Sequence, residues 1–105
     1  MKSIAWSSSA AADLRDIVDW LLEKATPTAA MAFVDRVDEK VAQLPMHPES
    51  GRVIPELERQ NISKYREVIL SPWRVFYSNT DDSVLILSVI DGRRNIEDVL
   101  LRRNL

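Results

Sequence analysis

Three consecutive runs of β-forming residues, between Tyr65 and Arg94, constrain the fold more than any other part of the chain. Each run is rich in valine, isoleucine and aromatic residues, and two turn signals separate them, Ser71-Pro72 and Asn79 to Asp82. This arrangement predicts a three-stranded antiparallel meander. The last run, Val84 to Ile90, is almost continuously apolar, which indicates a strand at the centre of the sheet or covered on both faces.

The N-terminal half carries a short strand and two amphipathic helical patterns. Lys2 to Trp6 alternates weakly and predicts the strand. Ser7 to Ser9 offers a cap for the first helix, and Thr26-Pro27 starts the second, which ends before Pro45. Two helices joined by a few residues predict an antiparallel hairpin whose apolar face packs on the sheet. Trp6 and Trp20 are expected to take part in that packing.

The remaining segments predict a connection and a final short helix. Residues 45–64 contain three prolines and one glycine without a sustained period, which indicates a surface connection, part of which packs down. Asn95 can cap a C-terminal helix. The predicted fold class is α+β: an N-terminal strand, a two-helix hairpin on a small antiparallel sheet (the meander plus the first strand), and a short C-terminal helix. Residues 1–105 are expected to form one domain.

Composition excludes several functional classes. The chain has no cysteine and one histidine, so disulfides and thiolate or histidine-cluster metal sites are not expected, and no cofactor is implied. Residues 1–63 carry a net charge of −3 and residues 64–105 a net charge of +1, far from the basic character of a protein that binds nucleic acid through charge alone. No signal peptide or membrane span is recognised, so the expected location is cytoplasmic.

Several motifs in this order carry a family resemblance. Trp73 to Tyr77 forms an aromatic-arginine-aliphatic-x-tyrosine strand, and the last strand leads into Gly92-Arg93-Arg94. Upstream motifs are Ala11 to Leu14 with Ile17 and Trp20, Leu44-Pro45 with Pro48 and Gly51-Arg52, and Pro55-Glu56 before Tyr65-Arg66-Glu67-Val68. Over nearly the whole chain, these motifs and their order resemble the RelE/ParE family of type II toxins.

The resemblance implies a bacterial toxin that a ParD-like antitoxin, encoded by an adjacent gene, neutralises in a hetero-oligomer. Such an antitoxin is expected to lay a helix and an extended segment across apolar surface of the toxin. ParE-like members act on DNA gyrase, block replication and serve plasmid or chromosome stability. RelE-like members cut messenger RNA on the ribosome. Because the two groups share a fold, only the site residues can distinguish them.

RNA cleavage through the 2′-hydroxyl needs a base, cations that hold the phosphate, and an acid for the leaving oxygen. Arg74 and Arg94 (or Arg93) match the cations of RelE-like members. The acid has no match, because residues 95–105 contain no tyrosine, histidine or lysine, and Asp91 stands where many members carry histidine. The hypothesis preferred here is therefore a gyrase-binding toxin that is not an enzyme. An mRNA endoribonuclease and a non-toxic antitoxin-binding module remain alternatives.

The predicted target-binding residues lie at the rim of the sheet and in the segment after it: Arg66, Trp73, Arg74, Arg93 and Arg94. Arginine and tryptophan are the types that most often dominate interfaces. The competing interpretation is structural. In that case Arg66 and Arg74 are ordinary strand residues paired with Glu67 or Asp91, and Arg93-Arg94 is a solvated strand end. Tyr77 is expected to pack between sheet and helix, with its hydroxyl bonded to a partner.

Overall fold

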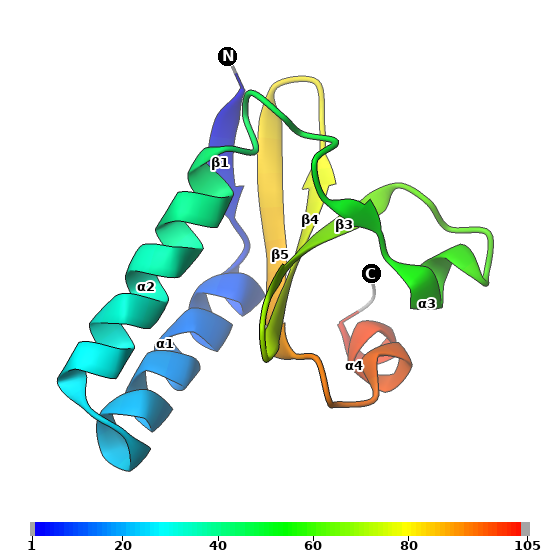
Figure 1. Ribbon diagram of the computed structural model, residues 1–105. Helices are drawn as coiled ribbons and strands as arrows, with labels where there is room; N and C mark the ends of the chain where they lie inside the picture. Colours follow the sequence, from blue (N-terminus) through cyan, green and yellow to red (C-terminus); the bar gives the residue numbers. More distant parts are fainter. Residues whose placement is uncertain (1, 104–105) are drawn as a thin grey trace.

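A five-stranded sheet with helices on both faces forms the protein (Figure 1). The structure, a computed structural model, describes residues 2–103. The strands are β1 (Ser3–Trp6), β2 (Arg52–Val53), β3 (Tyr65–Leu70), β4 (Trp73–Asn79) and β5 (Ser83–Asp91). The helices are α1 (Ser8–Lys24), α2 (Pro27–Ala42), α3 (Pro55–Glu58) and α4 (Ile96–Arg102). This is the α+β fold that the sequence predicts.

The strand order is β1-β5-β4-β3-β2, and β3, β4 and β5 form the predicted antiparallel meander. The nearly continuous apolar strand β5 lies between β1 and β4, as its composition predicted. One detail differs from expectation, because β1 joins β5 in parallel, with Ser3 opposite Ser83 and Trp6 opposite Ile86. This pairing joins residues 80 positions apart. No turn signal in the sequence could have indicated its direction.

Side-chain caps fix the start of both long helices, at the residues that the sequence offers for this. The Ser7 hydroxyl accepts a hydrogen bond from the Ala10 amide at 3.0 Å and donates one to the Leu87 carbonyl at 3.1 Å. The Thr26 hydroxyl accepts a hydrogen bond from the Ala29 amide at 3.1 Å. Ser7 therefore ends the N-terminal strand, begins α1 and anchors the helix on β5 with one side chain.

The α1–α2 hairpin covers one face of the sheet and forms the larger core with it (Figure 1). Fully enclosed side chains from both layers meet there, among them Val37, Leu44, Val75 and Ile86. Each such side chain contributes roughly 1.5–3 kcal/mol by leaving water. Packing of the hairpin on the sheet is therefore the main source of stability on this face.

The helices α3 and α4 cover the opposite face of the sheet, where they form a second core (Figure 1). Phe76 and Ile90 of the sheet pack there with Ile54 and Leu57 from the 45–64 segment. This segment was expected to be an irregular connection, part of which packs down. The packing is confirmed, but the segment also contains β2 and α3, which that prediction missed.

An ion pair ties α4 to the opposite end of the chain. The guanidinium of Arg103, which follows α4, donates to both carboxylate oxygens of Asp13 in α1 at 2.6 and 2.7 Å and to the Ser88 hydroxyl at 3.0 Å. Asp13 also accepts a hydrogen bond from the Val89 amide at 2.9 Å. The pairing with Asp13 raises the pKa of Arg103. The short C-terminal helix is thereby held against β5 and α1.

The expectation for Trp20 is wrong, because 54% of its side chain is exposed. Trp6, by contrast, packs at the edge of the larger core as predicted. Trp20 lies at the margin of the apolar stripe of α1, where helical spacing alone does not distinguish a buried side from an exposed one. Among residues 2–103, no helix is both long and apolar enough to cross a membrane.

Candidate functional site

The arginine expected to bind a target or a phosphate, Arg74, lies inside the protein. It projects from β4 into a cluster with Glu67 of β3 and Glu56 of α3. The guanidinium donates to both oxygens of Glu56 at 2.7 and 2.8 Å and to both oxygens of Glu67 at 2.5 and 2.7 Å. Arg52 of β2 adds a hydrogen bond to Glu67 at 3.0 Å. We call these four residues the Arg74 cluster.

Burial makes the Arg74 cluster a strongly coupled unit. The side chain of Glu67 is fully enclosed and that of Arg74 is 10% exposed. The hydrogen bonds from Arg74 lower the pKa of Glu56 to about 2, and the two carboxylates raise the pKa of Arg74. No buried side-chain nitrogen or oxygen in residues 2–103 lacks a hydrogen-bond partner. The guanidinium is therefore already neutralised before any ligand approaches.

Strand geometry explains how charged residues come to lie in the core. Glu67 pairs with Phe76, and Arg74 lies two residues before Phe76 on the same face of β4. The Arg74 guanidinium also stands 5.3 Å from the centre of the Phe76 ring. A side chain at Gly92 would come within 3.0 Å of the Arg74 stem. Glycine at this position lets the turn after β5 lie directly on that stem.

Arg66 and Tyr77 hold the connection before β2 against the sheet. The Arg66 guanidinium donates to the Gly51 carbonyl at 2.7 Å. The Tyr77 hydroxyl donates to the Pro48 carbonyl at 2.8 Å and accepts from the Gly51 amide at 3.0 Å, as expected for a buried tyrosine. A side chain at Gly51 would lie 2.5 Å from the Glu67 carbonyl oxygen. This close approach requires glycine.

Trp73 lies on the opposite face of β4 from Arg74, because successive residues of a strand point in opposite directions. Its ring packs against Phe33 of α2, with 4.6 Å between ring centres. Trp73 also lines a pocket of about 380 Å³ between α1 and the ends of β4 and β5. We call this the tryptophan pocket; its lining consists of Asp16, Ile17, Trp20, Pro72, Trp73, Asp91 and Arg93.

The two arginines after β5 differ in their surroundings. Arg93 is exposed but paired with Asp91, with contacts of 3.0 and 2.6 Å to its two carboxylate oxygens. These bonds lower the pKa of Asp91 to about 2. The side chain of Arg94 is also exposed and has no ion-pair partner among residues 2–103. Of the five predicted binding residues, Arg94 is the one that is exposed and has no ion-pair partner within residues 2–103.

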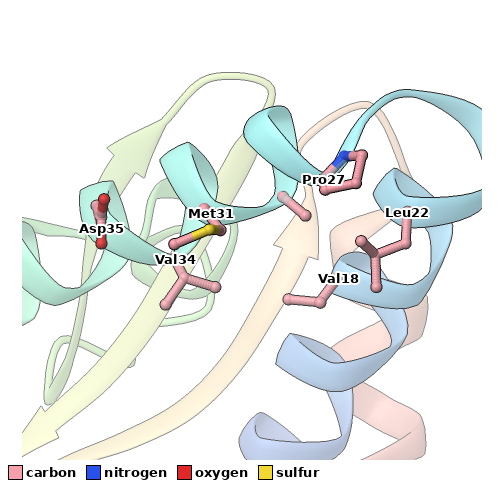
Figure 2. Close-up of a pocket in the computed structure, with 7 residues that line it drawn as sticks. Val18, Leu22, Pro27, Met31, Val34 and Asp35 are labelled. Atoms are coloured by element: carbon pink, nitrogen blue, oxygen red, sulfur yellow. The ribbon is translucent and has the colours of Figure 1, made fainter.

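An apolar groove runs between the two helices of the hairpin. It has a volume of about 280 Å³, and we call it the hairpin groove; its lining consists of Val18, Leu22, Pro27, Ala30, Met31, Val34 and Asp35. Val18 and Leu22 project from α1 toward α2, Pro27 closes one end, and Asp35 lies at the other (Figure 2). Leu22 is 48% exposed and Met31 68% exposed. Apolar surface for a partner is expected from the family resemblance, but the sequence does not indicate where on the protein it lies.

Comparison with known proteins identifies the family. A family model described as the ParE toxin of the type II toxin–antitoxin system parDE matches residues 4–96. The chain belongs to this family. The structure is also similar to the solved structure of a chromosomal ParDE toxin–antitoxin system from P. aeruginosa, with a TM-score of 0.70 and 25% identity over 87% of this chain and 96% of that one.

Its ParE fold extends to more distant proteins. The YoeB dimer from Staphylococcus aureus matches with a TM-score of 0.58 and 16% identity over 83% of this chain and 92% of that one. At this identity the likeness concerns the fold alone. No curated protein matches the chain.

The site geometry of this ParE family member limits its chemistry. The two carboxylates of the Arg74 cluster already accept four hydrogen bonds from its guanidinium. No group of three or more metal-ligating side chains lies together in the described part of the chain. Both carboxylates neutralise Arg74: Glu67, which the sequence suggests only as its structural partner, and Glu56, which the sequence does not indicate as a partner. The sequence feature that indicates Glu67 is its position on β3, the strand that pairs with the strand of Arg74. The only sequence feature that marks Glu56 is the Pro55-Glu56 motif.

Proposed function

We propose that this ParE family member is a toxin that binds DNA gyrase, does not cut messenger RNA, and is neutralised by a cognate antitoxin. The observation that favours gyrase over messenger RNA as the target is the pairing of Arg74 with two carboxylates, Glu56 and Glu67. A catalytic arginine stabilises charge that develops in the transition state, and it does so best when its donors are free and aimed at the reacting group. Here four hydrogen bonds are already made inside the protein.

The other groups required for RNA cleavage also argue against that activity. Glu56 is the more exposed of the two carboxylates bonded to Arg74 and hence the candidate base, but its pKa of about 2 makes it a weak proton acceptor at neutral pH. Tyr77, whose pKa is raised by burial, has its hydroxyl bonded to two backbone groups. Residues 95–105 supply no tyrosine, histidine or lysine that could act as the acid.

We place the gyrase contact at the turn after β5, with Arg94 as its central residue. Arg93 contributes to the same surface through its pair with Asp91. Trp73 is assigned to the edge of this contact, and Arg74 supports it from inside through its packing under Gly92. Arg66 is left out of the contact, because it pairs with Tyr77, four positions along β4 from Trp73, and its guanidinium is bonded to the Gly51 carbonyl. An exposed guanidinium without a carboxylate partner keeps its full capacity for a new bidentate contact.

The antitoxin contact is assigned to the hairpin groove. A helix of the antitoxin that places two or three apolar side chains between α1 and α2 would cover Leu22 and Met31, which water otherwise surrounds. The similar structure from P. aeruginosa is that of a ParDE toxin–antitoxin system, which supports a protein partner of this kind. The apolar side chains at the surface of the hairpin then form the binding face for the antitoxin, which buries them in the complex.

The test of the target uses purified protein in two parallel reactions. One contains gyrase and relaxed or supercoiled plasmid, and the other contains translating ribosomes and messenger RNA. Loss of supercoiling or accumulation of cleaved plasmid, with intact messenger RNA, is the expected result. Cleaved messenger RNA with unaffected gyrase would overturn the proposal, and no effect in either reaction would favour the non-toxic binding module.

Variants sharpen the same experiment. Arg94→Ala is expected to abolish the effect on gyrase without changing the unfolding midpoint, because its side chain is exposed. Arg102→Ala, an exposed arginine in the last turn of α4, serves as the matched control. The antitoxin contact is tested by co-expression with the protein that the adjacent gene encodes. Met31→Asp is expected to weaken binding of that protein. Lys40 is exposed on the same helix, and Lys40→Asp is expected to leave the binding unchanged. If both variants bind the antitoxin equally well, the antitoxin contact does not lie in the hairpin groove.

A further inference from the structure

The tryptophan pocket borders the proposed gyrase contact, with which it shares Trp73 and Arg93, but the rest of its lining has no role in that contact. Two indole side chains, Trp20 from α1 and Trp73 from β4, line one cavity of about 380 Å³. Drug-sized ligands occupy cavities of roughly 300–1,000 Å³, so this pocket is at the small end of that range. Its size suits one long side chain of a partner better than a free cofactor.

The charge of the lining favours a cation. Asp16 and Asp91 provide two carboxylates and Arg93 one guanidinium, which leaves a net charge of −1. Arg93 is committed to Asp91 by two hydrogen bonds, so this pair presents a nearly neutral wall. The Asp16 side chain is exposed and has no ion-pair partner among residues 2–103. One carboxylate at the pocket therefore remains available.

The surrounding surface has the same sign. The hairpin, residues 8–42, contains seven acidic and four basic residues, a net charge of −3. An acidic face steers basic partners toward itself and disfavours acidic ones. Indole faces attract cations, and tryptophan does so best among the aromatic residues. The pocket and its surroundings thus select for the same class of ligand.

We propose that the tryptophan pocket binds an arginine side chain from a basic segment of a partner polypeptide, with Trp20 and Trp73 contacting the guanidinium plane and Asp16 pairing with its edge. Arginine fits better than lysine because its planar fork stacks on aromatic rings and pairs with a carboxylate through two donors. This site is separate from the hairpin groove and shares no lining residue with it. The inference is independent of whether gyrase is the target.

The direct test titrates the folded protein with the capped tripeptide acetyl-Gly-Arg-Gly-amide and follows the indole N–H signals by NMR. The expected result is a saturable shift of the Trp20 and Trp73 signals, with Trp6 unaffected. The same tripeptide with citrulline, which has nearly the same shape but no charge, is expected to give no saturable shift. Equal binding of the citrulline tripeptide, or no saturation by the arginine tripeptide up to its solubility limit, would overturn the proposal.

Variants separate the parts of the site. Asp16→Asn is expected to weaken binding by about five-fold, the upper range for an exposed ion pair, while Asp19→Asn, exposed on the same helix but outside the pocket, leaves it unchanged. Trp20→Ala should weaken binding by roughly three-fold to ten-fold through loss of the cation–π contact. Equal affinities in the Asp16 and Asp19 variants would refute the role of Asp16.

A third substitution distinguishes this proposal from an anion site built on Arg93. Arg93→Ala removes both guanidinium hydrogen bonds to Asp91 and leaves its carboxylate only the bond from the residue 93 amide, so binding of the arginine tripeptide should become tighter. If the pocket instead binds carboxylates through Arg93, the same variant would leave arginine binding absent and abolish binding of acetyl-Gly-Glu-Gly-amide. The two hypotheses therefore predict opposite responses to one change.

Discussion

Replacing Arg74 by methionine keeps much of the side-chain volume but removes the charge at the centre of the Arg74 cluster. Glu67, whose side chain is fully enclosed, would then keep only its contact with Arg52, which is 59% exposed. Glu56 is 19% exposed and can be solvated by a small movement. Removing one member of a buried ion pair costs about 3–5 kcal/mol, because the remaining charge has lost its partner. We expect Arg74→Met to destabilise the protein by this amount.

The assay is denaturant unfolding followed by tryptophan fluorescence, with Arg93→Met as the matched control. The Arg93 side chain is 79% exposed, so its substitution should change the free energy of unfolding by less than about 0.5 kcal/mol. Adding Glu67→Leu to Arg74→Met should recover stability, since the unpaired buried charge is then gone. A loss below about 1 kcal/mol for Arg74→Met, or a further loss in the double variant, would refute the structural role of this arginine.

Three further predictions concern other contacts of the fold. Because pairing lowers the pKa of Glu56 from 4.5 to about 2, its stabilisation is complete above pH 4.5 and disappears as the pH falls toward 2; Glu56→Gln should flatten the pH dependence of unfolding in this window. Arg103→Ala should cost about 1.5–3 kcal/mol and lower hydrogen-exchange protection in α4, whereas Arg102→Ala should change neither. Tyr77→Phe should cost about 1–3 kcal/mol by leaving two backbone groups without a partner, and Tyr65→Phe, whose hydroxyl has no hydrogen bond within residues 2–103, should cost less.

The sequence predicted the elements that have long, regular patterns. The meander follows from three β-rich runs with turns between them, and the hairpin follows from two apolar stripes with Ser7 and Thr26 as caps. It missed β2 and α3, which span two and four residues. Elements this short have too few residues to establish a period, and contacts with the sheet decide their conformation.

The site was harder to predict than the fold. A strand position occupied by glutamate or arginine is read as exposed, because charged side chains are rarely enclosed without a partner. Glu67 and Arg74 are partners of each other, on neighbouring strands. Their pairing is the structural alternative that the sequence allows for Arg74, but the participation of Glu56 follows only once α3 is placed against the sheet. Whether the five predicted residues contact a target is still a prediction.

The parallel pairing of β1 with β5 has a consequence for synthesis on the ribosome. The hairpin leaves the ribosome early, but its main sheet partner, β5, comes about 40 residues later. At about 5–20 residues per second, this delay lasts roughly 2–8 seconds, during which the surface of α1 that β5 covers in the folded protein is open. The first strand must also wait for the same partner. The nascent chain therefore exposes part of the hairpin to other molecules until β5 takes its place between β1 and β4 and completes the sheet.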